Sequence, residues 1–305
     1  MIRRIYILFM LIILQYSSMN CEWIYVEKFD NTSNTTISNV ESIHCVDSSN
    51  CFALIQHTGN FENADWRIYK SYNSGLDWNL TYESPNIYEQ GNPIVISVEN
   101  AVFPNTSHIF VTSGQDPIIV KSIDSGKTFK KIILQEDASG SDKTLRSFAM
   151  YDENYGFVRN ANYYFTTTDG WETFQRHPFP DAKEGVYQSL FLDSNTVAMM
   201  RYTRPPLDTH NHMTFMKYYL KENTWDTLFY FGAEYKQWLD APKHIYFVND
   251  SLGFSCGSGV SSSLPDGEYY DIIYKTTDGG ENWELIHKEL EHPEKGLYNN
   301  IAFAD

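Results

Sequence analysis

One eight-residue pattern recurs along the chain at intervals near 50 residues. Each copy reads Ser or Thr, any residue, Asp or Asn, any residue, Gly, two further residues and an aromatic side chain. The clear copies cover 71–78, 122–129, 167–174 and 276–283, and Trp171 replaces the glycine in the third. A weaker copy at 221–228 keeps Asn223 and ends on Leu228. A period near 50 residues, marked by turn signals, predicts one propeller blade for each copy.

The residue types of the pattern suit a turn. Its defining members are Asn73, Gly75 and Trp78; Asp124, Gly126 and Phe129; Asp169 and Phe174; and Asp278, Gly280 and Trp283. A strand-like run precedes each copy and another begins at its last residue, so each copy is predicted to be a hairpin turn. The Asp or Asn side chain can accept bonds from turn N–H groups, glycine supplies a positive φ, and the aromatic ring can pack between sheets. This predicts a structural role, with calcium binding by the aspartates as the alternative.

Two further strand-like runs precede each turn, which makes four strands per repeat. The clearest pair is 243–248 and 252–257, joined by Asn-Asp-Ser. We therefore expect an all-β propeller of four-stranded blades with five recognisable blades. Residues 297–305 look like the first strand of a sixth blade, and 23–26 like an outer strand. Either the chain is truncated, which we favour, or an irregular element closes five full blades.

With four copies in register, the chain resembles the Asp-box, or BNR-repeat, family of β-propellers over nearly all of residues 21–305. A strand motif that ends in Gly-Phe, at Gly156-Phe157 and Gly253-Phe254, is most similar to photosystem II assembly-factor-like and uncharacterised secreted sialidase-like propellers. The resemblance implies a fold and no single activity, because the family includes sialidases, xyloglucan-cleaving glycoside hydrolases and sortilin-type receptors.

The N-terminal 20 residues have the layout of an export signal. Arg3 and Arg4 precede an apolar run over 5–14 that is too short to span a bilayer, and a polar stretch over 15–20 follows. This predicts a cleaved signal peptide over 1–20 and a secreted, periplasmic or cell-surface protein. Cys21 stands where a bacterial lipoprotein carries its acylated cysteine. The alternative is an ordinary leader with Cys21 free or trimmed away.

Two cysteines stand at the ends of a short hairpin. Cys45 and Cys51 flank a polar Asp-Ser-Ser-Asn turn between apolar stretches, where cross-strand sulfur atoms can meet. An extracytoplasmic protein can keep such a bond, so we predict a Cys45–Cys51 disulfide. Cys256 lies in a strand-like run and is predicted to belong to the core.

Charge and arginine content narrow the classes of function. The chain has 39 Asp plus Glu against 23 Lys plus Arg, for a net charge of −16, so a phosphate backbone would be repelled and a nucleic-acid partner is excluded. The resemblance to sialidases would imply three arginines that hold a substrate carboxylate and an Arg-Ile-Pro segment. No Arg-Ile-Pro occurs, and no arginine triad is recognisable, which favours a protein that is not an enzyme.

One irregular segment, 201–212, is a candidate binding loop between the second and third strands of the fourth blade. Its candidate residues are Arg201, Arg204, Asp208, His210 and His212. The last three alternate, so an extended backbone would place them on one face, as a metal site requires. The alternative is a solvated loop with ordinary turn chemistry.

These patterns favour an extracytoplasmic, non-catalytic scaffold that binds or assembles a protein or glycan partner, without a cofactor and without a transmembrane helix. The competing hypothesis is a glycan-acting glycoside hydrolase with paired carboxylates on one face of the propeller.

Overall fold

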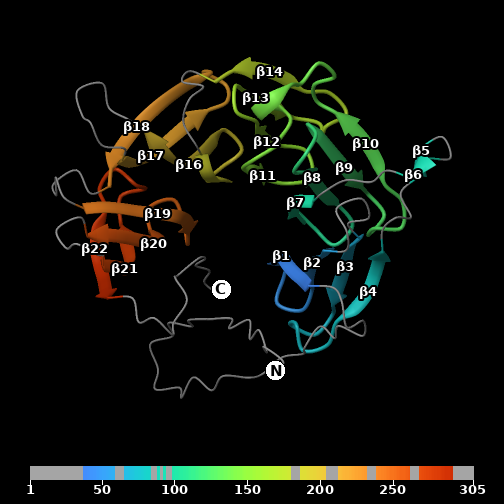
Figure 1. Cartoon of the computed structure of the whole chain (residues 1–305), viewed down its shortest axis with the longest axis horizontal. Helices are drawn as coiled ribbons and strands as arrows, with labels where there is room; N and C mark the ends of the chain where they lie inside the picture. The colour runs from blue at the N-terminus through green and yellow to red at the C-terminus, as the bar shows by residue number, and fades with distance from the viewer. Residues whose placement is uncertain are drawn as a thin grey trace. The chain divides into compact units, whose positions relative to one another are not determined.

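The computed structural model of the chain describes residues 37–58, 65–83, 88–89, 92–93, 98–179, 186–203, 212–231, 238–261 and 268–290. Within these ranges the chain is built from β-strands, with a single 3₁₀ turn at Gly140–Asp142 and no α-helix (Figure 1). The expected signal peptide over 1–20, Cys21 and the suggested partial sixth blade lie outside the described residues.

Five four-stranded antiparallel sheets form the blades of a β-propeller, which confirms the expected fold class (Figure 1). Within each blade the strands pair in chain order. Blade one contains β1 (Ile37–Cys45), β2 (Cys51–Thr58), β3 (Asp65–Ser71) and β4 (Asn79–Glu83). Blade two contains β7 (Val98–Val102), β8 (Ile109–Ser113), β9 (Ile118–Ser122) and β10 (Lys130–Ile133). Blade three contains β11 (Phe148–Met150), β12 (Gly156–Arg159), β13 (Tyr163–Thr167) and β14 (Gln175–Pro178). Blade four contains β15 (Val186–Phe191), β16 (Thr196–Thr203), β17 (His212–Tyr219) and β18 (Thr224–Tyr230). Blade five contains β19 (Trp238–Phe247), β20 (Gly253–Ser261), β21 (Glu268–Thr276) and β22 (Glu284–Leu290). The short strands β5 (Tyr88–Glu89) and β6 (Asn92–Pro93) pair with each other between blades one and two.

The chain divides into two compact units. Val26–Thr227 holds blades one to three and most of blade four, and the unit that includes Leu228–Asp305 holds blade five. In the larger unit, hydrophobic clusters lie between consecutive blades. Phe52, Trp66 and Tyr82 of blade one pack with Ile109 and Val111 of blade two, and similar clusters join blades two with three and three with four.

Position within a blade decides burial. Every residue of β8 and of β9 is buried, because these middle strands are covered on both faces. The outermost strands β10 and β14 are largely exposed. The buried middle strands give the aromatic residues, 16% of the chain, a place between the blades.

The predicted disulfide is confirmed in blade one. Cys45 and Cys51 face each other across the β1–β2 hairpin and are joined by a disulfide bond. The turn between them is shaped by Asp47, whose carboxylate accepts bonds from the N–H groups of Ser49 and Asn50 at 2.8 and 2.7 Å.

This first turn is one copy of a second repeated turn, which joins the first two strands of each blade. An Asp or Asn in each blade accepts bonds from the N–H groups two and three residues later: Asp47, Asn105, Asp152, Asp193 and Asn249. In four blades the turn also accepts a bond from the repeat motif, as in Ser74 N–H to Ser49 O at 2.9 Å. In these four blades a backbone hydrogen bond therefore connects the turn between the first two strands to the turn between the last two.

The weak copy in blade four is not a turn of the same kind. β17 ends at Tyr219 and β18 begins at Thr224, so the connection is four residues long and Leu228 lies inside β18. The expectation that Leu228 closes a copy of the motif is therefore wrong. Trp225 packs against Tyr218 at a ring distance of 4.4 Å, and the side chain of Asn223 accepts bonds from Tyr164 and Tyr218.

Candidate functional site

The four clear motif copies share one hydrogen-bond scheme, which we call the box turn. The Ser or Thr hydroxyl accepts the N–H of the residue at the glycine position, at 2.8 to 2.9 Å in all four. The Asp or Asn oxygen accepts the N–H four residues later at 2.9 Å. Trp171 fills the glycine position with φ +69° and still donates to Thr167.

The box aspartates are occupied by bonds within their own turns. Asp124 accepts bonds from the hydroxyl and the N–H of Thr128, which lower the pKa of its carboxyl to about 2. The N–H and side-chain amide of Asn282 lower the pKa of Asp278 to about 2 in the same way. These contacts support the predicted structural role. Within the described residues, no group of three or more His, Cys, Asp or Glu is placed to hold a metal ion.

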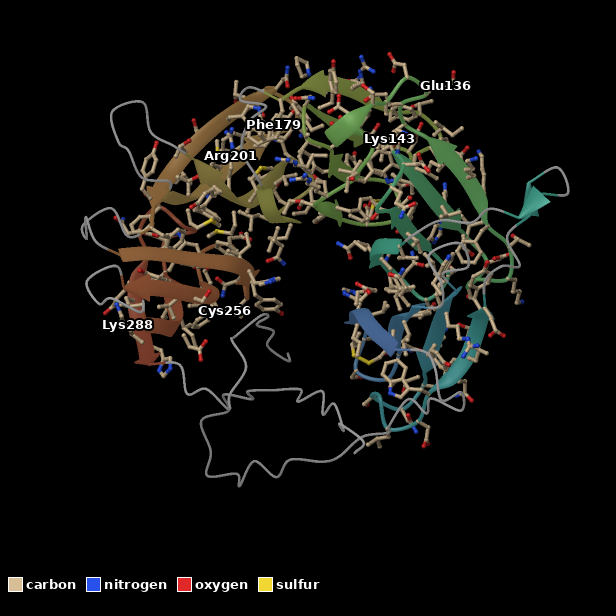
Figure 2. The ribbon with its side chains drawn as sticks, viewed as in Figure 1. Glu136, Lys143, Phe179, Arg201, Cys256 and Lys288 are labelled. Carbon is tan, nitrogen blue, oxygen red and sulfur yellow. A yellow bond between two sulfur atoms is a disulfide. The ribbon has the colours of Figure 1, made fainter. Side chains whose placement is uncertain are left out.

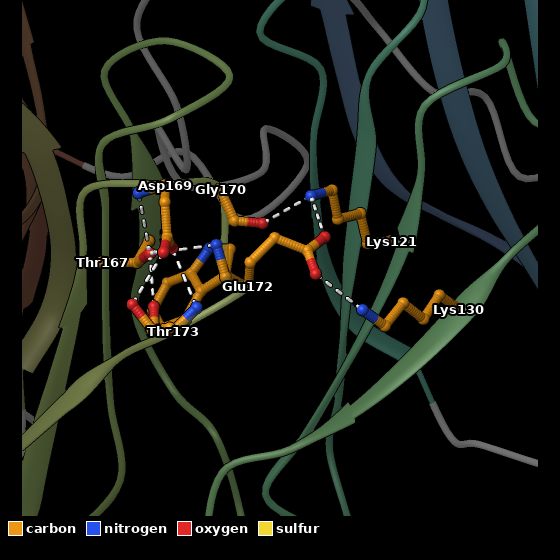
Figure 3. A network of polar contacts seen from close by, with 8 residues as sticks. Lys121, Lys130, Thr167, Asp169, Gly170, Glu172 and Thr173 are labelled. Atoms are coloured by element: carbon orange, nitrogen blue, oxygen red, sulfur yellow. Dashed lines mark hydrogen bonds and ion pairs between the residues drawn. The ribbon is translucent and has the colours of Figure 1, made fainter.

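The box turns lie at the C-terminal ends of the third strands, and at this end a buried lysine joins blades two and three (Figure 3). Lys121, 9% exposed, donates to Gly170 O at 2.8 Å and to Glu172 at 3.0 Å. Lys130 contacts the other oxygen of Glu172 at 2.7 Å. Two lysines from blade two therefore hold one carboxylate from the box turn of blade three.

The candidate binding loop is placed in part. Its position between the second and third strands of blade four is confirmed, but β16 continues through Arg201 to Thr203, so the expectation that Arg201 belongs to an irregular loop is wrong. Arg204, Asp208 and His210 lie outside the described residues. His212 is the first residue of β17 and pairs with Thr203.

Arg201 instead belongs to a buried cationic cluster between blades three and four, with Arg159 and Phe179. Arg201 is 3% exposed and Arg159 only 1%. Each guanidinium carbon lies 5.0 Å from the centre of the Phe179 ring, which favours cations near its face. Phe179 and Arg201 lie beside each other in Figure 2, and a terminal nitrogen of Arg201 is 3.8 Å from the sulfur of Met216.

These residues gather at the end of the blades opposite the box turns. β12 and β16 run toward that end, and Arg159 and Arg201 lie near their C-termini. Phe179 follows β14, which runs the same way. Arg146 stands just before β11 at this end, and its N–H donates to Arg159 O at 2.8 Å. The side chain of Arg146 is exposed, so the cluster reaches the surface through it.

The charges of neighbouring arginines affect the pKa of Arg159. Burial, and then the charges of Arg146 and Arg201, lower the pKa of Arg159 from 12.5 to about 9. Arg159 therefore keeps its charge at neutral pH, and the like charges repel. In a chain of net charge −16, Arg159 and Arg201 lie against Phe179, and the charge of Arg146 acts on Arg159.

Arg159 was not predicted as a site residue, because it ends an apolar run, Gly-Phe-Val-Arg, that indicates a buried strand. An arginine at the end of such a run was the available signal.

Cys256 is confirmed as a buried residue of β20, and burial, followed by the charge of Asp271, raises the pKa of its thiol to about 12. A thiol of that pKa is a poor nucleophile.

No model of a known protein family matches the chain, and no curated protein sequence matches it. Solved structures resemble it. A GH74 enzyme from Niastella koreensis matches with a TM-score of 0.56 and 15% identity over 81% of this chain. A GH74 xyloglucanase from Xanthomonas campestris matches with a TM-score of 0.50 and 11% identity over 81% of this chain. This chain covers 38% of each of those two enzymes. YCF48 from Cyanidioschyzon merolae matches with a TM-score of 0.49 and 12% identity, over 82% of this chain and 85% of that one. At these identities the likeness shows the β-propeller fold alone.

A search of the described residues for a helix long and apolar enough to cross a membrane finds none.

Proposed function

We propose that this protein is an extracytoplasmic, non-catalytic binding scaffold that holds an acidic segment of a protein partner. The observation that carries the proposal is the arginine cluster. Arg159 and Arg201 lie against Phe179, and the charge of the exposed Arg146 acts on Arg159. A carboxylate brought to this cluster would meet Arg146 at the surface and reduce the repulsion among the three guanidinium groups. Arginine suits this role, because its planar fork of donors matches a carboxylate.

The arrangement of the blades supports different roles for their two ends, a structural role at the box-turn end and binding at the opposite end. At the box-turn end, Asp and Asn side chains are occupied by hydrogen bonds within their own turns, and these turns hold the hairpins together. The arginine cluster lies at the other end, where Arg201 stands near the C-terminus of β16 in blade four. A scaffold that binds through this end can keep its turns unchanged.

A peptide-binding assay tests the proposal. A fluorescein-labelled peptide rich in Asp and Glu is titrated with the protein at low ionic strength, where charged contacts are strongest. Arg146→Ala should weaken binding by about three- to tenfold, the range for removal of one exposed charged contact. The matched control is Arg176→Ala, which removes an exposed arginine of β14 that stacks on Tyr163 instead. Equal losses in both variants, or none in Arg146→Ala, would contradict the proposal.

Glycoside hydrolysis is the competing hypothesis, because GH74 enzymes share the fold. A panel of fluorogenic glycosides and xyloglucan separates the two. Turnover that is abolished by a single Asp or Glu substitution would replace the scaffold with an enzyme.

A further inference from the structure

Lys70 and Lys121 occupy equivalent positions in blades one and two but have different surroundings. Each directly precedes the serine that opens a box turn. Each also pairs across the sheet with a phenylalanine, Lys70 with Phe52 and Lys121 with Phe110. The two ammonium groups lie 5.0 and 5.9 Å from the centres of those rings.

Lys121 shows what this position binds. Its ammonium group contacts Gly170 O and the carboxylate of Glu172, both in the box turn of the next blade, and Lys130 shares the carboxylate (Figure 3). At this position Lys121 therefore donates to a carboxylate of the neighbouring box turn.

The box turn of blade two has no carboxylate at the position that corresponds to Glu172. Where blade three has Gly170 and Glu172, blade two has Ser125 and Lys127. A Cβ atom at Gly170 would lie 3.3 Å from Nζ of Lys121, so a side chain at this position crowds the approach. In blade two the Ser125 side chain stands there and donates to Thr106 O. The box turn of blade two faces blade one, since a Cβ atom at Gly126 would lie 3.9 Å from the Cβ atom of Tyr82.

Lys70 consequently remains over its own blade. It is 6% exposed, and its ammonium group lies 5.0 Å from the ring of Phe52 and 4.8 Å from that of Tyr72. Among the described residues it forms these contacts and no hydrogen bond or ion pair. Asp47 attracts it from a distance, but that carboxylate is held by Ser49 and Asn50.

Apolar side chains are exposed in the same two box turns. Tyr72 is 59% exposed and Leu76 52% in the turn of blade one, and Ile123 is 61% exposed in the turn of blade two. We call Lys70, Lys127 and these three residues the lysine patch. Tyr72 lies against Lys70, and Ile123 and Lys127 belong to one box turn. Such cations and exposed apolar residues are suited to a protein segment that carries both a carboxylate and an apolar side chain.

We propose that the lysine patch docks an acidic segment of a protein partner. A Glu or Asp of that segment takes, beside Lys70, the place that Glu172 takes beside Lys121, and an adjacent apolar residue packs on Tyr72 and Ile123. The lysine patch lies at the box-turn end, so this contact is separate from the arginine cluster and does not depend on it.

Two short peptides test this inference. One is fluorescein-labelled Ser-Gly-Leu-Glu-Leu-Gly-Ser with an amidated C-terminus, and its twin has Gln in place of Glu. Fluorescence anisotropy at low ionic strength should show about three- to tenfold tighter binding of the Glu peptide. Lys127→Glu, which recreates the carboxylate of blade three, should remove this preference, and Lys127→Gln should reduce it.

The control is Lys221→Glu, an equal change of charge at an exposed turn of blade four. This variant and Arg146→Ala should both keep the preference for the Glu peptide. Equal binding of the two peptides by the unmodified protein would overturn the inference. An equal loss in Lys221→Glu would do the same. Loss in Arg146→Ala but not in Lys127→Glu would overturn it too, while supporting the arginine cluster as the peptide site.

Discussion

Asn73 donates its side-chain amide to the carboxylate of Asp77 at 2.8 Å, which reverses the polarity found in the other box turns. In those turns the third residue is an aspartate, which accepts a bond from the side chain four residues later, Thr128, Thr173 or Asn282. Each of these residue pairs thus consists of one carboxylate and one donor, and the two can exchange places. The asparagine of the first copy is therefore part of a complementary pair.

This exchange predicts a strong coupling between Asn73 and Asp77. Asn73→Asp should lower the free energy of unfolding by about 1 kcal/mol, because two carboxylates then face each other where a hydrogen bond was. Adding Asp77→Thr should recover most of the loss by recreating the pair found in blades two and three. Urea unfolding of the two single variants and the double variant measures the coupling. Additive effects would show that the two side chains act independently.

The box aspartates predict a loss of stability in acid. The pKa of Asp124 falls from its ordinary value of 3.8 to about 2 on folding, and that of Asp278 does the same. A lowered pKa means that the stabilisation is complete above about pH 4 and is lost as the pH falls toward 2. The difference in unfolding free energy between the unmodified protein and Asp124→Asn should shrink over that interval. A difference that stays constant from pH 5 to 2 would contradict the assignment.

Glu172 contacts the buried Lys121 and the exposed Lys130, so we predict that removing its carboxylate destabilises the protein more than removing Lys130. Glu172→Gln should destabilise the protein by about 1–2 kcal/mol, because it removes the carboxylate from a buried ammonium group. Lys130→Gln should cost less than about 0.5 kcal/mol, since the Lys130 side chain is 63% exposed. Urea unfolding compares the variants. A loss in Lys130→Gln as large as that in Glu172→Gln would show that burial of Lys121 does not set the strength of the contact.

Trp171 predicts a conflict between backbone strain and packing. A bulky residue at φ +69° is strained by about 1 kcal/mol, yet its ring is 1% exposed in the cluster between blades two and three. Trp171→Gly should restore the common motif but lose net stability, by about 2–4 kcal/mol, because deleting a buried ring costs more than the strain. Thermal unfolding checks the sign. A more stable glycine variant would show that the strain exceeds the packing.

Local patterns were sufficient for most of the fold. The spacing of Asp, Gly and aromatic residues predicted the hairpin turns, and alternating apolar runs predicted the strands between them, because turns and strands depend on neighbouring residues. The Cys45–Cys51 disulfide followed from a six-residue separation across one hairpin. The error at Leu228 arose where a tight turn replaced the motif, and Trp225 with Tyr218 supplied the packing that a local pattern does not encode.

The candidate sites were decided by contacts between blades. Arg159 and Arg201 are 42 residues apart in the sequence, and each looked like part of a different local element until packing brought both to Phe179. Lys70 and Lys121 stand in the same local pattern. The blade next to Lys121 contributes Glu172, whereas the blade next to Lys70 has Lys127 at the position of that glutamate. Short-range patterns thus settled that the chain forms four-stranded blades. Lys121 and Arg201 each contact side chains or carbonyl oxygens of the neighbouring blade, and only the packed structure brings these groups together.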